Sequence, residues 1–158
     1  MKKILDVCCG GRMFWFDKNN PDVLFLDKRT VPGRMVGKGR NARMFECRPD
    51  KVMDFTDLKL PSNSFSLVVF DPPHLTRAGK GSYMGLKYGV LDKNWQDQIS
   101  KGFKECFRVL KKNGVLIFKW NEYDIRLSKI LALTPVKPLF GHPSGKRQQT
   151  HWVSFIKH

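Results

Sequence analysis

The apolar residues of this chain gather in short runs, and most runs stop at a polar or charged residue. Runs that are rich in Val, Leu, Ile and Phe, without alternating polar residues, are typical of strands buried on both faces of a parallel sheet. They predict strands at residues 3–9, 23–26, 51–55, 67–70 and 115–118. Two later segments, 136–140 and 152–156, predict a closing pair of strands with a basic turn at 141–147 between them.

Helical spacing is strongest between residues 94 and 112, where five large apolar residues predict a buried face: Trp95, Ile99, Phe103, Phe107 and Leu110. Asn113 and Gly114 predict the end of this helix. Shorter helices are predicted at residues 12–18 and 124–133. Strands that alternate with helices over 158 residues predict one α/β domain, residues 1–158, with no room for a second.

Two glycine-rich basic segments, residues 28–50 and 75–92, lack a helical pattern. The first predicts a long loop where a crossover helix would usually join two parallel strands, and its arginines favour an arm that contacts phosphates and orders on binding. The second mixes cations and tyrosines with glycine, which suits a loop that stacks on bases and follows phosphates. An ordinary solvated surface loop is the alternative for both. The residues that we expect to contact a substrate are Arg40, Arg43, Arg77, Lys80, Tyr83 and, after the strand at 115–118, Trp120.

The charge of the chain is strongly positive, with 29 Lys and Arg against 14 Asp and Glu and a formal net charge of +15. Such an excess favours a polyanionic partner, of which nucleic acid is the obvious one. The alternative is that the charge only keeps a small protein soluble. No basic amphipathic helix stands out, so a membrane surface is not the expected partner.

The remaining composition predicts a cytoplasmic protein. No segment has the apolar length that spans a membrane, and the first residues enter a strand pattern without a signal-peptide core. The four cysteines follow neither a disulfide framework nor metal-ligand spacing, so we expect no metal: Cys8, Cys9, Cys47 and Cys106. The oligomeric state stays open, a monomer included.

Candidate chemistry lies where the predicted strands end. The run at 67–70 stops at an acid, two prolines and an imidazole, and prolines cannot continue a sheet ladder. Ligands of open α/β sheets bind at the carboxyl ends of the strands. The residues at these ends are Gly10 and Gly11 after the first strand, Asp27, Asp54, and the stretch Asp71, Pro72, Pro73 and His74.

Taken together, these motifs resemble the class I S-adenosylmethionine-dependent methyltransferases over nearly the whole chain. Residues 5–11 resemble their first motif, an acid, small residues and glycines after the first strand. Asp27 matches the acid that holds the cofactor ribose, and Asp54 matches the acid that faces the adenine amine. Residues 71–74 resemble the amino-methyltransferase signature of Asp, Asn or Ser, two prolines and an aromatic residue, with His74 in the aromatic position.

The resemblance implies a Rossmann-like α/β fold. Its expected features are a mostly parallel twisted sheet of about seven strands, an antiparallel C-terminal strand and helices on both faces. The length of the chain leaves no room for a separate target-recognition domain. The implied cofactor is S-adenosylmethionine. The residues expected to hold it are Asp6, Cys8, Gly10, Gly11, Asp27, Lys28, Asp54, Phe55 and Asp71.

The resemblance also implies methyl transfer to an exocyclic amine of a nucleic-acid base, adenine N6 ahead of cytosine N4, in RNA or DNA. Asp71 and the Pro72 carbonyl would accept the amine hydrogens, and Pro73 and His74 complete the catalytic corner. The alternatives are a methyltransferase for a protein amide or small molecule, and an inactive nucleic-acid-binding module of the same fold. A cytosine C5 enzyme is disfavoured, because it needs a catalytic thiol and no Pro-Cys pair follows the central strand.

Overall fold

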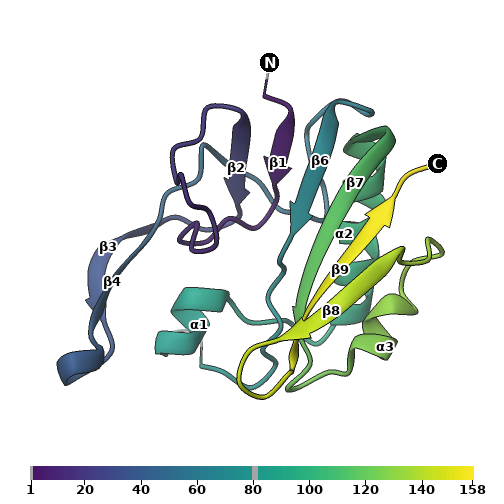
Figure 1. Cartoon of the computed structure of the whole chain (residues 1–158). Coiled ribbons are helices and arrows are strands. Elements are labelled where there is room, and N and C mark those ends of the chain that lie inside the picture. The colour runs from purple at the N-terminus through teal and green to yellow at the C-terminus, as the bar shows by residue number, and fades with distance from the viewer. Residues whose placement is uncertain (1, 80–81) are drawn as a thin grey trace.

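The centre of the protein is a seven-stranded sheet in a computed structural model that describes residues 2–79 and 82–158 (Figure 1). The strand order is β5-β2-β1-β6-β7-β9-β8. The strands are β1 (Ile4–Asp6), β2 (Val23–Asp27), β5 (Lys51–Val52), β6 (Phe65–Phe70), β7 (Leu110–Asn121), β8 (Phe140–Ser144) and β9 (Thr150–Ile156). The first five are parallel and β9 and β8 are antiparallel, which confirms the predicted mostly parallel sheet.

The position of β1 determines where a ligand can bind. β1 pairs in parallel with β2 on one side and with β6 on the other. The chain therefore changes direction across the sheet beside β1, and the carboxyl ends of these strands frame a crevice. Asp6 and Asp27 are the last residues of β1 and β2, and Asp71 directly follows β6.

The main core lies between one face of the sheet and two helices, α2 (Trp95–Val109) and α3 (Leu127–Leu131). Aromatic rings of α2 and the strands interlock there, with Phe70 and Phe103 centred 5.6 Å apart. A Cβ on Gly102 would lie 2.6 Å from the Phe70 ring and 2.8 Å from that of Phe55. Glycine is therefore needed at this position for α2 to approach the sheet.

The other face of the sheet is covered differently. There Trp15 packs on the cluster of Cys9, Val23 and Phe25, and its ring lies edge-on to Phe25. The helix predicted at residues 12–18 is wrong, because these residues form turns and bends. Arg12 holds them in place: its guanidinium donates to the carbonyls of residues 18 and 48 and lies 3.9 Å from the Phe25 ring centre.

The two glycine-rich segments contain regular structure that the sequence analysis missed. Residues 28–50 include the antiparallel pair β3 (Val31–Val36) and β4 (Arg43–Cys47), joined by a 3-10 turn, η1 (Gly39–Asn41). Residues 75–92 include a short helix, α1 (Tyr83–Tyr88). Gly37 and Gly39 have φ of 95° and 55° at the tip of the hairpin. These glycines therefore mark a tight turn between strands, where we predicted an open loop.

Several predicted boundaries also move. The long helix ends at Val109, because residues 110–114 already belong to β7, and Asn113 adopts a φ of 62° within that strand. The closing pair begins later than predicted, at Phe140, so the first four residues of the predicted turn, 141–144, lie in β8. The strand predicted at 51–55 is shorter, because β5 has two residues. The helix predicted at 124–133 is also shorter, because α3 has five. No helix of the described residues is long and apolar enough to cross a membrane.

Candidate functional site

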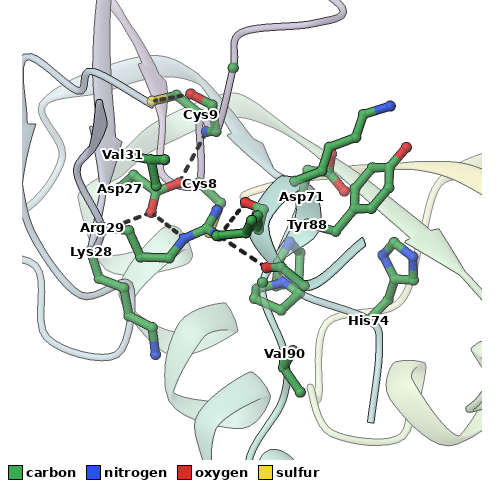
Figure 2. A pocket seen from close by; sticks show the side chains of 18 of the residues that line it. Cys8, Cys9, Asp27, Lys28, Arg29, Val31, Asp71, His74, Tyr88 and Val90 are labelled. Carbon is green, nitrogen blue, oxygen red and sulfur yellow. Dashed lines mark hydrogen bonds and ion pairs between the residues drawn. The ribbon is translucent and has the colours of Figure 1, made fainter. Parts of the chain in front are cut away.

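A cavity of about 450 Å³ opens at the carboxyl ends of β1, β2 and β6 (Figure 2). Its wall combines the glycine turn after β1, the residues after β2, the segment 71–74, α1 and Lys119 of β7. This volume lies in the range of roughly 300–1,000 Å³ that is usual for small-molecule sites. The cavity therefore lies at the sheet edge that the sequence analysis predicted.

One wall is organised by the buried carboxylate of Asp27. It accepts hydrogen bonds from the backbone N–H of Gly10 at 3.0 Å and from the backbone N–H and Nε of Arg29 at 2.9 and 3.2 Å. A carboxylate has about four acceptor positions, so one position remains for a ligand hydroxyl. Gly10 has a φ of 47°, a conformation that favours glycine.

Arg29 joins this wall to α1. Its Nη1 donates to the carbonyls of Leu86 at 2.9 Å and Gly85 at 3.5 Å, while its Nε binds Asp27 (Figure 2). Both helix residues line the cavity. Arg29 therefore fixes α1 beside the strand ends, a role that the sequence analysis did not assign to it.

The opposite wall carries an ion pair between Asp71 and Lys119, with 2.8 Å from Nζ to Oδ2. Burial raises the pKa of the Asp71 carboxyl, and the Lys119 charge and hydrogen bond act against that rise. The ammonium group also lies 5.7 Å from the ring centres of Phe14 and Trp152. Lys119 therefore favours the ionised form of this carboxylate, whereas burial favours its protonated form.

His74 lies beside this pair and is 8% exposed. Its ring centre is 5.4 Å from that of Tyr88 and 6.3 Å from that of Trp120. Burial, with a further contribution from the Lys119 charge, lowers the pKa of His74 to about 4. The imidazole is therefore neutral near pH 7 and offers a flat aromatic face.

A second cavity of about 470 Å³ is also lined by His74. It shares His74, Tyr88 and Lys119 with the first cavity. Its other lining residues are Leu75, Met84, Asn121, Tyr123, Gln149 and Thr150. Two adjoining spaces thus meet at one aromatic and charged boundary, an arrangement that can hold two reactants side by side.

Most of the predicted cofactor and catalytic residues line the first cavity: Cys8, Gly10, Gly11, Asp27, Lys28, Phe55, Asp71, Pro72, Pro73 and His74. Asp6 does not. It is fully buried behind the wall, where it accepts from the Trp15 indole N–H at 2.7 Å and the Cys8 backbone N–H at 3.2 Å. Burial raises the pKa of Asp6 to about 7.

Asp54 and Trp120 require correction. The Asp54 carboxylate lies outside the cavity lining and accepts from the backbone N–H and hydroxyl of Thr56 at 2.9 and 2.8 Å. Trp120 is fully buried in the main core, where its indole N–H donates to the Ile125 carbonyl at 2.8 Å. It supports the His74 ring from behind and is not free to contact a substrate.

The predicted substrate residues do not gather at the cavity. Arg40 and Arg43 lie on the β3–β4 hairpin, and Arg77 and Tyr83 are exposed outside both linings. Lys80 lies outside the described residues. The lining residues to which the sequence analysis gave no role include Met13, Arg29, Val31, Leu86, Val90, Asp92 and Lys119.

Three potential metal ligands also meet next to the first cavity. The ligand atoms of Cys9, Asp27 and Cys47 lie within 4.8 Å of one another, and all three residues are buried. All four cysteines are free thiols. The sequence analysis expected no metal, because residues 9 and 47 are too distant in sequence to form a recognisable motif. The cationic Arg29 on the same carboxylate opposes a second positive charge there.

Comparison with known proteins identifies the fold. No family model matches the chain, and no curated protein does. The PH0226 protein from Pyrococcus horikoshii OT3 is 13% identical with a TM-score of 0.60, over 98% of this chain and 81% of that one. A TehB-like SAM-dependent methyltransferase from Corynebacterium glutamicum ATCC 13032 Kitasato is 16% identical with a TM-score of 0.58, over 99% and 80%. The chain has the Rossmann-like α/β fold of class I methyltransferases.

Proposed function

We propose that the protein is an S-adenosylmethionine-dependent methyltransferase acting on an exocyclic amino nitrogen of a nucleic-acid base, with adenine N6 favoured over cytosine N4. The observation that carries the proposal is the position of Asp71. It is a partly buried carboxylate held by Lys119, and it precedes His74 at the boundary between two cavities. A fold likeness to a SAM-dependent methyltransferase supports the choice of cofactor.

The first cavity fits this cofactor. Asp27 retains an acceptor position for a ribose hydroxyl, and Phe55 offers an apolar surface for the adenine ring. The bound cofactor would supply an electrophilic methyl group on a positively charged sulfur. The carboxylate of Asp71 lies in the same cavity, where its charge complements that sulfur. Asp54, outside the lining, takes no part.

The corner at residues 71–73 is suited to an amine. Pro72 and Pro73 have no N–H, so this stretch of backbone offers carbonyl acceptors without competing donors. In our proposal Asp71 Oδ1, which Lys119 leaves free, and the Pro72 carbonyl accept the two amine hydrogens. This orients the nitrogen lone pair, and the carboxylate stabilises the positive charge that develops on nitrogen. The S–CH₃ bond would break as the N–CH₃ bond forms, S-adenosylhomocysteine would leave, and the nitrogen would release one proton to solvent. No covalent intermediate with the protein is required.

The second cavity suits the acceptor base. Neutral His74 and Tyr88 present ring faces at its boundary, and Asn121 and Gln149 provide side-chain amides on its wall. Stacking on an aromatic face contributes about 1–3 kcal/mol per base. A base must leave its helix, or already be single-stranded, to enter such a site. The net charge of +15 supports a nucleic acid as the molecule that carries the base.

Two experiments test the proposal in order. Calorimetric titration with S-adenosylmethionine and S-adenosylhomocysteine should give micromolar binding of both. DNA and RNA pools are then incubated with a donor labelled in its methyl group. An Asp71→Ala variant should keep cofactor and oligonucleotide binding and lose transfer, while Asp57→Ala, an exposed acid, serves as the control. Unchanged transfer by Asp71→Ala would refute the catalytic role of Asp71. If neither S-adenosylmethionine nor S-adenosylhomocysteine bound, the better account would be a nucleic-acid-binding protein without this activity.

A further inference from the structure

The β3–β4 hairpin, residues 31–47, forms a separate two-stranded ribbon that extends away from the seven-stranded sheet (Figure 1). We call it the basic ribbon. Its inner face is anchored: Val36, Phe45 and Cys47 are buried in one cluster that also contacts Leu86 of α1. At its base, a Cβ on Gly11 would lie 3.3 Å from the Phe45 ring. The ribbon is therefore packed directly against the cavity wall.

The charge of the ribbon has one sign over most of its length. From residue 28 to residue 45 the sequence contains no Asp or Glu. Its one acid, Glu46, pairs with Arg48 at 2.8 Å. Arg34, Lys38 and Arg40 are exposed and make no ion pair among the described residues. Like charges in so small an element repel one another, and a polyanion would relieve that repulsion.

The outer face of the ribbon carries an exposed apolar pair. Met35 and Met44 are directly opposite in the ladder and are 61% and 65% exposed. Because side chains alternate along a strand, Arg34 and Arg43 belong to the opposite face, that of Phe45 and Val36, and both are exposed there. Nothing in the described fold covers the methionine pair. Flexible, polarizable methionine side chains adapt to irregular apolar surfaces such as sugars and base edges.

We propose that the basic ribbon binds duplex DNA beside the target base, an inference that rests on the proposed function. The major groove of B-form DNA admits a two-stranded ribbon, whereas the corresponding groove of A-form RNA is too narrow and deep. The ribbon cations bind phosphates, and the methionine pair packs against sugars or base edges within the groove. The catalytic corner and the ribbon thus contact different parts of one acceptor.

The dimensions of the ribbon set the reach of this contact. Six residues of β3 extend about 20 Å at about 3.3 Å per residue. This length corresponds to about six base pairs at about 3.4 Å each. Because the base of the ribbon lines the cavity at Val31, the contact should cover about six base pairs on one side of the target.

The test is duplex DNA binding, measured by fluorescence anisotropy in 50 and 200 mM salt. The ribbon variant carries three substitutions that spare Arg43, because its guanidinium holds the tip by donating to the carbonyls of residues 40 and 42. These are Arg34→Gln, Lys38→Gln and Arg40→Gln. A control of equal charge change replaces three exposed lysines of α2 and the start of β7, distant from the strand carboxyl ends: Lys104, Lys111 and Lys112, each to Gln.

The slope of log affinity against log salt concentration should become about 2.7 less steep when three phosphate contacts are lost, at about 0.9 per contact. Between the two salt concentrations, wild-type affinity should therefore fall about 40-fold more than that of the ribbon variant. The control should keep the wild-type slope. A Met35→Thr, Met44→Thr protein should bind duplex DNA more weakly than wild type at both salt concentrations with an unchanged slope.

Failure of this inference differs from failure of the proposed function. The ribbon variant should retain wild-type cofactor binding and wild-type methyl transfer to a short single-stranded oligonucleotide. An unchanged salt slope, or an equal loss on an RNA duplex, would overturn the ribbon assignment while leaving the function intact. So would a methionine variant that binds DNA normally but loses self-association, because the outer face would then contact protein. Absence of transfer in the wild type would instead refute the proposed function.

Discussion

The ion pair between Asp71 and Lys119 gives the sharpest prediction about the proposed chemistry. Replacing Lys119 with Met keeps an apolar stem beside Phe14 and Trp152 and removes the charge. Burial alone then acts on the pKa of Asp71, which rises further. Because the proposed reaction uses the ionised carboxylate, the variant should lose activity at a higher pH than the wild type when the pH is lowered.

The magnitude follows from the geometry. Unit charges 2.8 Å apart interact by about 6 kcal/mol at an effective dielectric constant of about 20, which is an upper bound because Lys119 is 20% exposed. Opposite charges at such distances usually change a carboxyl pKa by about one to three units. The acid limb of the kcat profile should therefore move up by about one to three pH units. One unit below the variant's limb, its rate falls about tenfold relative to its plateau.

Two measurements check this prediction. The rate of methyl transfer is recorded against pH for wild type, Lys119→Met and the exposed control Lys104→Met. Carbon-13 NMR follows the Asp71 carboxyl directly, with Asp71→Asn to assign its signal. If the acid limb of the kcat profile of Lys119→Met stayed at the wild-type pH and only its maximal rate fell, the electrostatic argument would be refuted. Lys119 would then have a positioning role. A shifted limb in Lys104→Met would show that net charge alone is responsible.

Three further predictions concern stability and cofactor binding. Asp27→Ala should weaken S-adenosylmethionine binding by about 10- to 150-fold in calorimetry, because hydrogen bonds to a charged group contribute about 1.5–3 kcal/mol. Unchanged affinity would contradict the proposal that Asp27 binds the cofactor ribose. Asp6 has a folded pKa of about 7 against an ordinary 3.8, so the folded state binds its proton more tightly. The protonated Asp6 therefore stabilises the fold fully below pH 3.8, and this contribution is lost as the pH rises to about 7. Relative to Asp6→Asn, the free energy of unfolding of the wild type should fall by about 4 kcal/mol over this range, as urea unfolding at several pH values should detect. A pH-independent difference would refute it. Gly102→Ala should lower the free energy of unfolding by about 1–3 kcal/mol, because its methyl overlaps Phe70; an unchanged urea midpoint would count against that overlap.

The strand ends could be predicted from the sequence because their signals are local. Each apolar run and the acid or glycine that follows it lie within a few residues, as in 67–71. Parallel pairing then brings Gly10, Asp27 and Asp71 to one edge without knowledge of side-chain contacts. The same argument misplaced Asp54, because β5 ends at Val52 and the Asp54 carboxylate accepts from Thr56 outside the lining, while its neighbour Phe55 lines the cavity.

Residues that act through distant partners could not be predicted in this way. Arg29 matters because it reaches Leu86, 57 positions later in the chain. Lys119 had a usable signal: it follows the apolar run 115–118 in a strand beside β6. Side chains alternate across a strand, so Lys119 and Trp120 face opposite sides, with Phe118 and Trp120 stacked in the core. Choosing Trp120 as the substrate residue ignored that alternation.

The basic ribbon illustrates the limit of composition. Its glycines and arginines predicted a loop, and its strands form because buried Phe45 and Cys47 pack on α1, an interaction that no local pattern contains. The cations were recognised from the sequence, whereas the face on which each lies was not. Only the ladder register places the exposed Met35 and Met44 opposite each other.

The distribution of charge separates chemistry from acceptor binding. Of the three carboxylates that line the cavity, Asp27 and Asp71 are each paired with a cation, Arg29 and Lys119, and Asp92 accepts a hydrogen bond from the Gln98 side chain. The charges within the two ion pairs largely cancel, so these pairs contribute little to the net charge of +15. The unpaired cations of the ribbon lie on a different element, outside the cavity lining. Substitutions in the ribbon should therefore act on KM for long acceptors, whereas those at Asp71 and Lys119 should act on kcat.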